Sequence, residues 1–162
     1  MSIGSLYEYF RNRDAVIGAL MDRHIHEAEA DLLDALDPED PRAGSLETGV
    51  RSVIDRLIAQ HADHPTLHRL LVGIGMRSDP IRRRIQEAED HLCQRLEPWL
   101  RAHPDVRHPD PRLAARIMVQ GSNALVHRHV EDPGPVTNEQ LATELTRLWV
   151  AYLRGDEPGG ST

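Results

Sequence analysis

The sequence contains no lysine and few aromatic residues. All 19 basic residues are arginines, and the only aromatic residues are two Trp, three Tyr and one Phe. So low an aromatic content argues against β-sandwiches and barrels, which favour aromatic side chains. Because 26 acidic residues outnumber the 19 arginines, the net charge is −7. The surface as a whole is therefore expected to repel nucleic acid and anionic membranes, and any contact with DNA must be local.

Cysteine and long apolar runs are also scarce. Cys93 is the only cysteine, which excludes an internal disulfide framework and favours a reducing, cytoplasmic location. The longest apolar stretches, 15–21 and 70–76, are much shorter than the roughly 18 residues that a membrane span needs. The charged residues Glu8 and Arg11 interrupt any apolar segment of a secretory signal. We expect one compact cytoplasmic domain with no membrane partner.

The sequence motifs typical of enzymes and metal sites are absent. There is no phosphate-binding glycine loop, no GxSxG and no HExxH. The ten histidines include the pairs His24/His26 and His127/His129, but residues two apart on a helix point to different sides and chelate poorly. We expect no enzymatic activity, no metal site and no cofactor.

Apolar residues recur at steps of three and four, which is the period of an α-helix, and no strand pattern competes with it. Asp79 and Asp110 each precede a proline, as N-cap residues do. Thr137 and Gln140 have the spacing of a capping box. Pro98 should kink the helix that contains it, either around the core or to shape a cavity. The predicted helices are 4–10, 13–36, 45–62, 65–76, 80–102, 111–130 and 138–154.

The run Ser2 to Asp14, SIGSLYEYFRNRD, differs from a generic amphipathic helix because it contains three of the six aromatic residues. Hydroxyl groups of Ser and Tyr can donate to phosphate oxygens, and Arg pairs with them, so a DNA-contacting surface is one interpretation. A structural cluster is the other, because Leu6 and Phe10 are four residues apart and would face a core together.

This run resembles the recognition helix of the tetracycline-repressor (TetR) family of bacterial transcription regulators. That helix has the form Ser-x-Gly-Ser/Thr-Leu-Tyr-x-Tyr/His-Phe, followed by x-x-Lys/Arg-Glu/Asp at the start of a long connecting helix. The matching residues are Ser2, Gly4, Ser5, Leu6, Tyr7, Tyr9, Phe10, Arg13 and Asp14. The resemblance implies that Ile3, Gly4, Tyr7, Glu8 and Tyr9 face the major groove and that Ser5, Tyr7 and Arg13 contact phosphates.

The resemblance also implies the organisation of an all-α, TetR-like helical bundle. Residues 1–23 would be a partial helix-turn-helix, 24–154 a ligand-binding and dimerisation domain, and 155–162 a disordered tail. The family places two more helices before the recognition helix, and nothing before Ser2 corresponds to them. We therefore expect weak, non-specific DNA binding by these 162 residues and specific operator binding by a form that carries those helices.

Residues near the middle of the chain line an effector pocket in the resembled family. Apolar walls bury a ligand and a few polar groups orient it. The candidate residues for such a pocket, within 65–130, are the apolar Met76, Trp99 and Met118 and the polar His68, Asn123 and His127. The alternative for each of them is a place in a solid core.

Small residues on the predicted helix 111–130 face large ones on 138–154, which suits either an internal core or a two-fold interface. In the resembled family the last two helices form a four-helix dimer bundle, which favours the interface. The interface residues predicted on this basis are Gly121, Leu141, Leu145, Leu148, Trp149 and Tyr152.

These observations together predict a ligand-responsive TetR-family transcriptional regulator, specifically a repressor. Its dimer would place two recognition helices about 34 Å apart on double-stranded operator DNA, and a small apolar effector would alter that spacing. The alternative is a dimeric small-molecule-binding or interaction protein without DNA-binding activity.

Overall fold

A computed structural model describes residues 13–35, 44–62, 78–132 and 134–155, and all regular structure in these ranges is helical. The helices are α2 (Arg13–Ala35), α3 (Leu46–Ala62), α5 (Asp79–Ala102), α6 (Pro111–Glu131) and α7 (Asn138–Arg154). This confirms the all-α fold class and the five predicted helices that fall in the described ranges. The helices expected at 4–10 and 65–76 lie outside the described residues, as does the segment 156–162 of the expected tail.

Local capping signals set the ends of α6 and α7. The Asp110 carboxylate accepts hydrogen bonds from the backbone amides of Arg112 and Leu113, which otherwise have no partner in the first turn of α6. Thr137 and Gln140 form the predicted capping box at α7. Gly155 ends α7 in the left-handed conformation, with φ of 68°, which favours glycine.

One predicted cap is wrong. Asp79 is the first residue of α5, and Ser78 is the N-cap, with Pro80 in the first turn. The Asp79 carboxylate pairs with Arg82 one turn further along the helix. An acidic residue still stabilises the first turn, because it interacts favourably with the positive end of the helix dipole.

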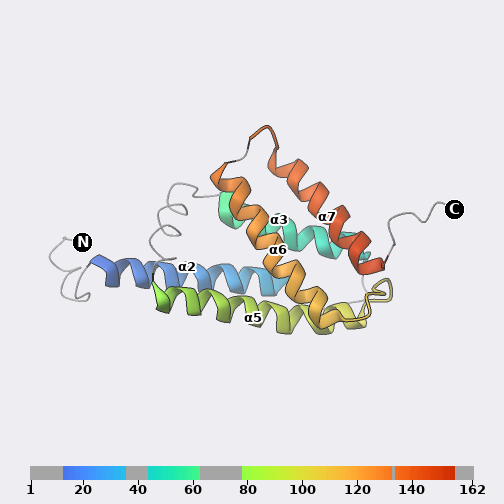
Figure 1. The fold of residues 1–162 in the computed structure, drawn as a ribbon, viewed down its shortest axis with the longest axis horizontal. Helices are drawn as coiled ribbons and strands as arrows, with labels where there is room; N and C mark the ends of the chain where they lie inside the picture. The colour runs from blue at the N-terminus through green and yellow to red at the C-terminus, as the bar shows by residue number, and fades with distance from the viewer. Residues whose placement is uncertain (1–12, 36–43, 63–77, 133, 156–162) are drawn as a thin grey trace.

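The helices form a bundle in which α2 and α5 run side by side in the same direction (Figure 1). Arg84 of α5 forms ion pairs with Asp22 and Glu29 of α2, and these contacts hold the two helices together. Helix α3 packs against α2 and α7, and α6 crosses α5 (Figure 1). Every described helix therefore buries at least one face against another, and the contact between α6 and α7 is the smallest of the main ones.

The main core joins α3, α5, α6 and α7, and it includes Leu32 of α2. Its fully buried large side chains are Leu46, Leu100, Val126 and Leu153. A second, small cluster of Met21 and Ile81 joins the first half of α2 to the start of α5. Among the described residues, this cluster contains fewer buried side chains than the main core and therefore buries less apolar surface.

Helix α5 continues across Pro98, which is exposed, while the neighbouring Trp99 is buried. Gly49 of α3 makes room for the Trp99 ring, because a Cβ built on Gly49 would lie 2.6 Å from Trp99 Cζ2. A glycine is thus required on the α3 face that receives the indole.

Gly49→Ala is expected to lower the free energy of unfolding by about 1 to 3 kcal/mol, the usual range for overpacking a rigid core site. The matched control is Gly18→Ala on α2, where a Cβ meets nothing within 4 Å. That control should raise stability by about 0.5 to 1 kcal/mol through helix propensity. Urea denaturation of both variants measures the difference, and equal effects would contradict the steric role of Gly49.

Candidate effector cavity

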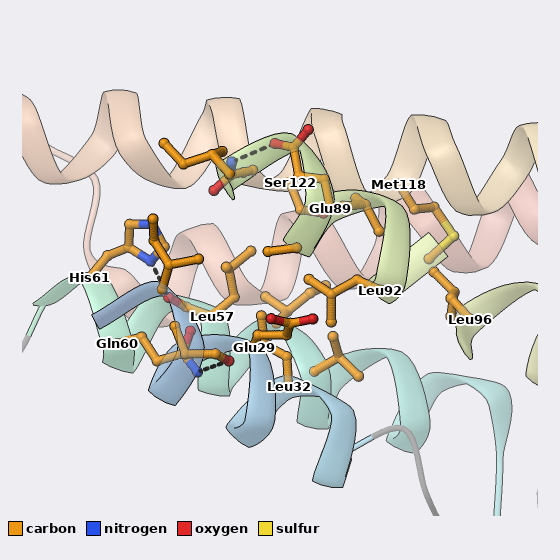
Figure 2. A pocket seen from close by; sticks show the side chains of 18 of the residues that line it. Glu29, Leu32, Leu57, Gln60, His61, Glu89, Leu92, Leu96, Met118 and Ser122 are labelled. Carbon is orange, nitrogen blue, oxygen red and sulfur yellow. Dashed lines mark hydrogen bonds between the residues drawn. The ribbon is translucent and has the colours of Figure 1, made fainter. Parts of the chain in front are cut away.

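A cavity of about 180 Å³ lies among the described helices, and its lining is almost entirely apolar. Helices α2, α3, α5 and α6 all contribute to it, and Trp149 reaches it from α7. Figure 2 shows its side chains converging from these elements. The apolar lining includes Met21, Ile25, Leu32, Val50, Leu57, Ile85, Leu92, Leu96, Trp99 and Met118. Such a space suits a small apolar molecule oriented by a few polar groups.

Four of the six residues predicted for a pocket line this cavity: Trp99, Met118, Asn123 and His127. The other two, His68 and Met76, lie outside the described residues. Trp99 and Met118 are buried, as walls would be. Asn123 and His127 are half-buried and supply polar atoms on α6.

Two histidines meet at the edge of the cavity, although 66 residues separate them. His61 Nε2 and His127 Nε2 are 3.2 Å apart, and the rings pack edge to face. His61 Nδ1 lies 2.7 Å from the Leu57 carbonyl oxygen, which can only accept, so this nitrogen donates. His61 Nε2 is then the acceptor in the neutral ring, and His127 Nε2 donates to it.

Burial keeps both rings of this pair uncharged near neutral pH. Loss of solvation lowers the pKa of His61 and lowers the pKa of His127 to about 4, and the neighbouring ring adds to the effect at His127. The pair therefore offers an uncharged polar edge in an otherwise apolar cavity.

A buried ion pair joins the α2 and α5 walls. The Glu29 carboxylate, which is 8% exposed, accepts from Arg84 Nη2 and His91 Nδ1, each at 2.7 Å. Burial alone would raise the pKa of Glu29, but these two hydrogen bonds and charges lower it overall. Glu29 is thus an ionised carboxylate whose charge is balanced by Arg84, and this ion pair links α2 to α5.

The remaining polar groups lie mainly along α6. Asn123 Nδ2 donates to the Glu89 carboxylate at 3.0 Å across the α5/α6 contact. Trp149 Nε1 donates to Ser122 Oγ at 2.9 Å, which satisfies a buried donor. On α3, Gln60 Nε2 donates to the Ala28 carbonyl oxygen, which ties α3 to α2.

The small-to-large complementarity of the last two helices lies inside the chain. A Cβ on Gly121 would lie 3.1 Å from the Trp149 ring, so Gly121 is where α6 receives this indole. Leu145 and Trp149 belong to the core of the chain and are only 3% and 6% exposed. The apolar stripe on α7 is equally consistent with packing inside the chain and with a dimer interface, because both bury large side chains at the same helical spacing. The sequence alone therefore did not distinguish the two.

Helices α6 and α7 also carry large apolar residues that are exposed within one chain. Leu148 is 51% exposed, and Leu141 and Tyr152 are half-buried beside it. Helix α6 adds Leu113, Ile117 and Leu125, all at least 40% exposed. We call these four exposed leucine and isoleucine side chains, Leu113, Ile117, Leu125 and Leu148, the outer α6/α7 patch.

The residues assigned to DNA contact, Ile3, Gly4, Ser5, Tyr7, Glu8 and Tyr9, lie outside the described residues. Arg13 is the first residue of α2. Within the described ranges, no helix combines the length and apolarity needed to span a membrane.

The sequence analysis placed the pocket within 65–130 and therefore did not predict that α2 and α3 contribute to the cavity lining. Val50, Leu57 and Ile58 form an apolar stripe, but this pattern is equally typical of a solid core. The α2 residues had a weaker signal still, because Met21, Ile25 and Leu32 are interrupted by charged residues.

The chain matches a family model described as the tetracyclin repressor-like C-terminal domain over residues 45–153. No curated protein matches the chain. The matched segment covers more than half of the chain and contains α3, α5, α6 and α7. This chain belongs to the tetracyclin repressor-like C-terminal domain family, which indicates a TetR-family regulator.

Proposed function

We propose that the protein is a ligand-responsive, DNA-binding transcriptional regulator, and specifically a repressor, whose effector is a small molecule held in the cavity. The observation that carries this proposal is the position of α2. Met21, Ile25 and Leu32 of α2 form one wall of the cavity, and α2 begins at Arg13, directly after the segment that resembles a recognition helix.

A ligand in the cavity would contact α2 directly. A ligand that fits one position of α2 better than another would shift the population toward the state that it fits better. Helices α5 and α6, which form other parts of the lining, pack together and belong largely to the main core. Among the described residues, fewer buried apolar side chains hold the first half of α2 than hold α5 and α6, so we expect α2 to be the wall that a ligand displaces most easily.

The proposed regulator is a homodimer whose contact surface is the outer α6/α7 patch together with Leu141 and Tyr152. A two-fold arrangement would bring the patch against its own copy and form a four-helix bundle from two α6/α7 pairs. Gly121, Leu145 and Trp149 then support this surface from within the chain.

Filling the cavity tests the effector proposal. Ala88 lines the cavity and is buried, so Ala88→Leu is expected to weaken ligand binding at least tenfold. Ala102→Leu, at an exposed site on the same helix, should leave it unchanged. In a thermal-shift screen of apolar compounds, a ligand at about 100 times its Kd should stabilise the wild-type chain by about 2.7 kcal/mol.

DNA binding is then measured by mobility shift, with and without the ligand, for this chain and for any in-frame upstream extension of its coding region. Ligand-dependent binding to a palindromic site is the expected result. A ligand that binds the cavity and leaves DNA binding absent in every form would favour the alternative, a dimeric small-molecule-binding protein without DNA-binding activity.

A further inference from the structure

Among the described residues, the cavity lining carries negative charge and no arginine. Its acidic residues are Glu29 and Glu89, and its remaining polar residues are histidines, amides and a serine. In a site with little water, such an imbalance matters more than at the surface, because the effective dielectric constant is lower.

The two carboxylates differ in how they are neutralised. Glu29 is paired with the Arg84 guanidinium and bonded to His91. Glu89 is bonded to the neutral amide of Asn123, and no described arginine or histidine forms an ion pair with it. Glu89 therefore brings to the α5/α6 wall a negative charge that has no ion-pair partner among the described residues. Figure 2 shows its carboxylate directed toward α6.

Other features of the lining also favour a positively charged ligand. Burial lowers the pKa of His61 and His127, so the pair supplies no positive charge near neutral pH. Two indoles, Trp99 and Trp149, line the same cavity, and the negative face of an indole attracts organic cations. The apolar walls in turn need a ligand with a large apolar body.

We propose that the cavity selects a lipophilic organic cation, with the Glu89 carboxylate as its counter-charge. This deepens the proposed effector function and rests on it. Among the described lining residues, a carboxylic acid would meet two carboxylates and no arginine, so it is disfavoured. A neutral ligand gains the apolar contacts but not the charge pairing, and binds more weakly than a cation of the same shape.

The preference for a cation is tested by isothermal titration calorimetry on the full chain with three probes that share a naphthylmethyl body and differ in charge. They are (naphthylmethyl)trimethylammonium, its uncharged carbon isostere neopentylnaphthalene, and the anion naphthylacetate. The cation should bind the wild-type chain about tenfold tighter than the isostere, the size expected for a partly desolvated cation–π and ion-pair contribution. The anion should bind most weakly.

Glu89→Gln keeps an acceptor for Asn123 and removes the charge, so it should reduce the preference for the cation over the isostere to the part that the two indoles supply. The matched control is Glu87→Gln, at an exposed position two residues earlier on α5, which should keep the preference. Thermal melting of both variants verifies that they are folded.

The outcomes separate the two proposals. Equal binding of cation and isostere by the wild-type chain, or an unchanged preference in Glu89→Gln, would overturn the cation selectivity and leave the effector cavity standing. If none of the three probes binds the wild-type chain, the cation selectivity is overturned, and the thermal-shift screen of apolar compounds decides separately whether the cavity holds an effector.

Discussion

Leu148→Arg is expected to convert the proposed homodimer into a folded monomer. The Leu148 side chain is 51% exposed within one chain, so an arginine there is solvated and costs the monomer little. In the proposed two-fold contact the same arginine would be desolvated beside apolar side chains and close to its own copy. Burying an unpaired charge costs several kcal/mol, so we expect a dimer dissociation constant at least about a thousandfold higher.

Leu145→Arg, three residues earlier on α7, is the informative comparison. Leu145 is 3% exposed and belongs to the main core, so an arginine there leaves a charge inside the chain. We expect this variant to unfold, with loss of about 4 kcal/mol or more. A monomer produced by Leu145→Arg would therefore report on folding and not on the interface.

Light scattering gives the mass of each species, and circular dichroism with thermal melting shows whether it is folded. The wild-type chain should have about twice the chain mass at micromolar concentration. A wild-type monomer, or a Leu148→Arg variant that stays dimeric, would contradict the assignment of the outer α6/α7 patch.

The bounds of the described helices were predictable because they depend on local signals. Predicted ranges such as 111–130 and 138–154 differ from Pro111–Glu131 and Asn138–Arg154 by at most one residue at either end. Proline, capping side chains and the 3.6-residue period all act within a few residues of the helix end that they determine. The Asp79 cap was misplaced by one position, because Ser78 precedes it and either residue can cap a helix.

The partner of each apolar face was less predictable. The α7 stripe identified Leu145, Leu148 and Trp149 as apolar positions, but only the packing of α7 against α3 and α6 shows that Leu148 is outside. Likewise, the meeting of His61 with His127 depends on how α3 and α6 are placed. No local pattern encodes a contact between side chains so far apart in the sequence.

Lowering the pH from about 7.5 to about 5 is expected to destabilise the protein by about 2 kcal/mol through His127 alone. The pKa of His127 falls from an ordinary value of 6.5 to about 4 because burial disfavours the charged ring. The unfolded chain therefore binds a proton in this window and the folded chain does not. The stabilisation that His127 contributes is fully present above the pKa of this residue in the unfolded chain. It is lost as the pH falls toward the pKa of this residue in the folded chain. The lowered pKa of His61 adds a loss of the same sign.

Two substitutions identify the source of this pH dependence. His127→Gln retains an amide donor for His61 but cannot titrate, so its urea-unfolding free energy should change less between the two pH values. His26→Gln removes an exposed histidine of α2 and should leave the wild-type dependence in place. Glu29 does not interfere, because hydrogen bonds from Arg84 and His91 lower its pKa, and its stabilising effect is lost only at more acidic pH. The same pH dependence in His127→Gln as in wild type would show that the buried His61–His127 pair does not stay neutral in the folded chain.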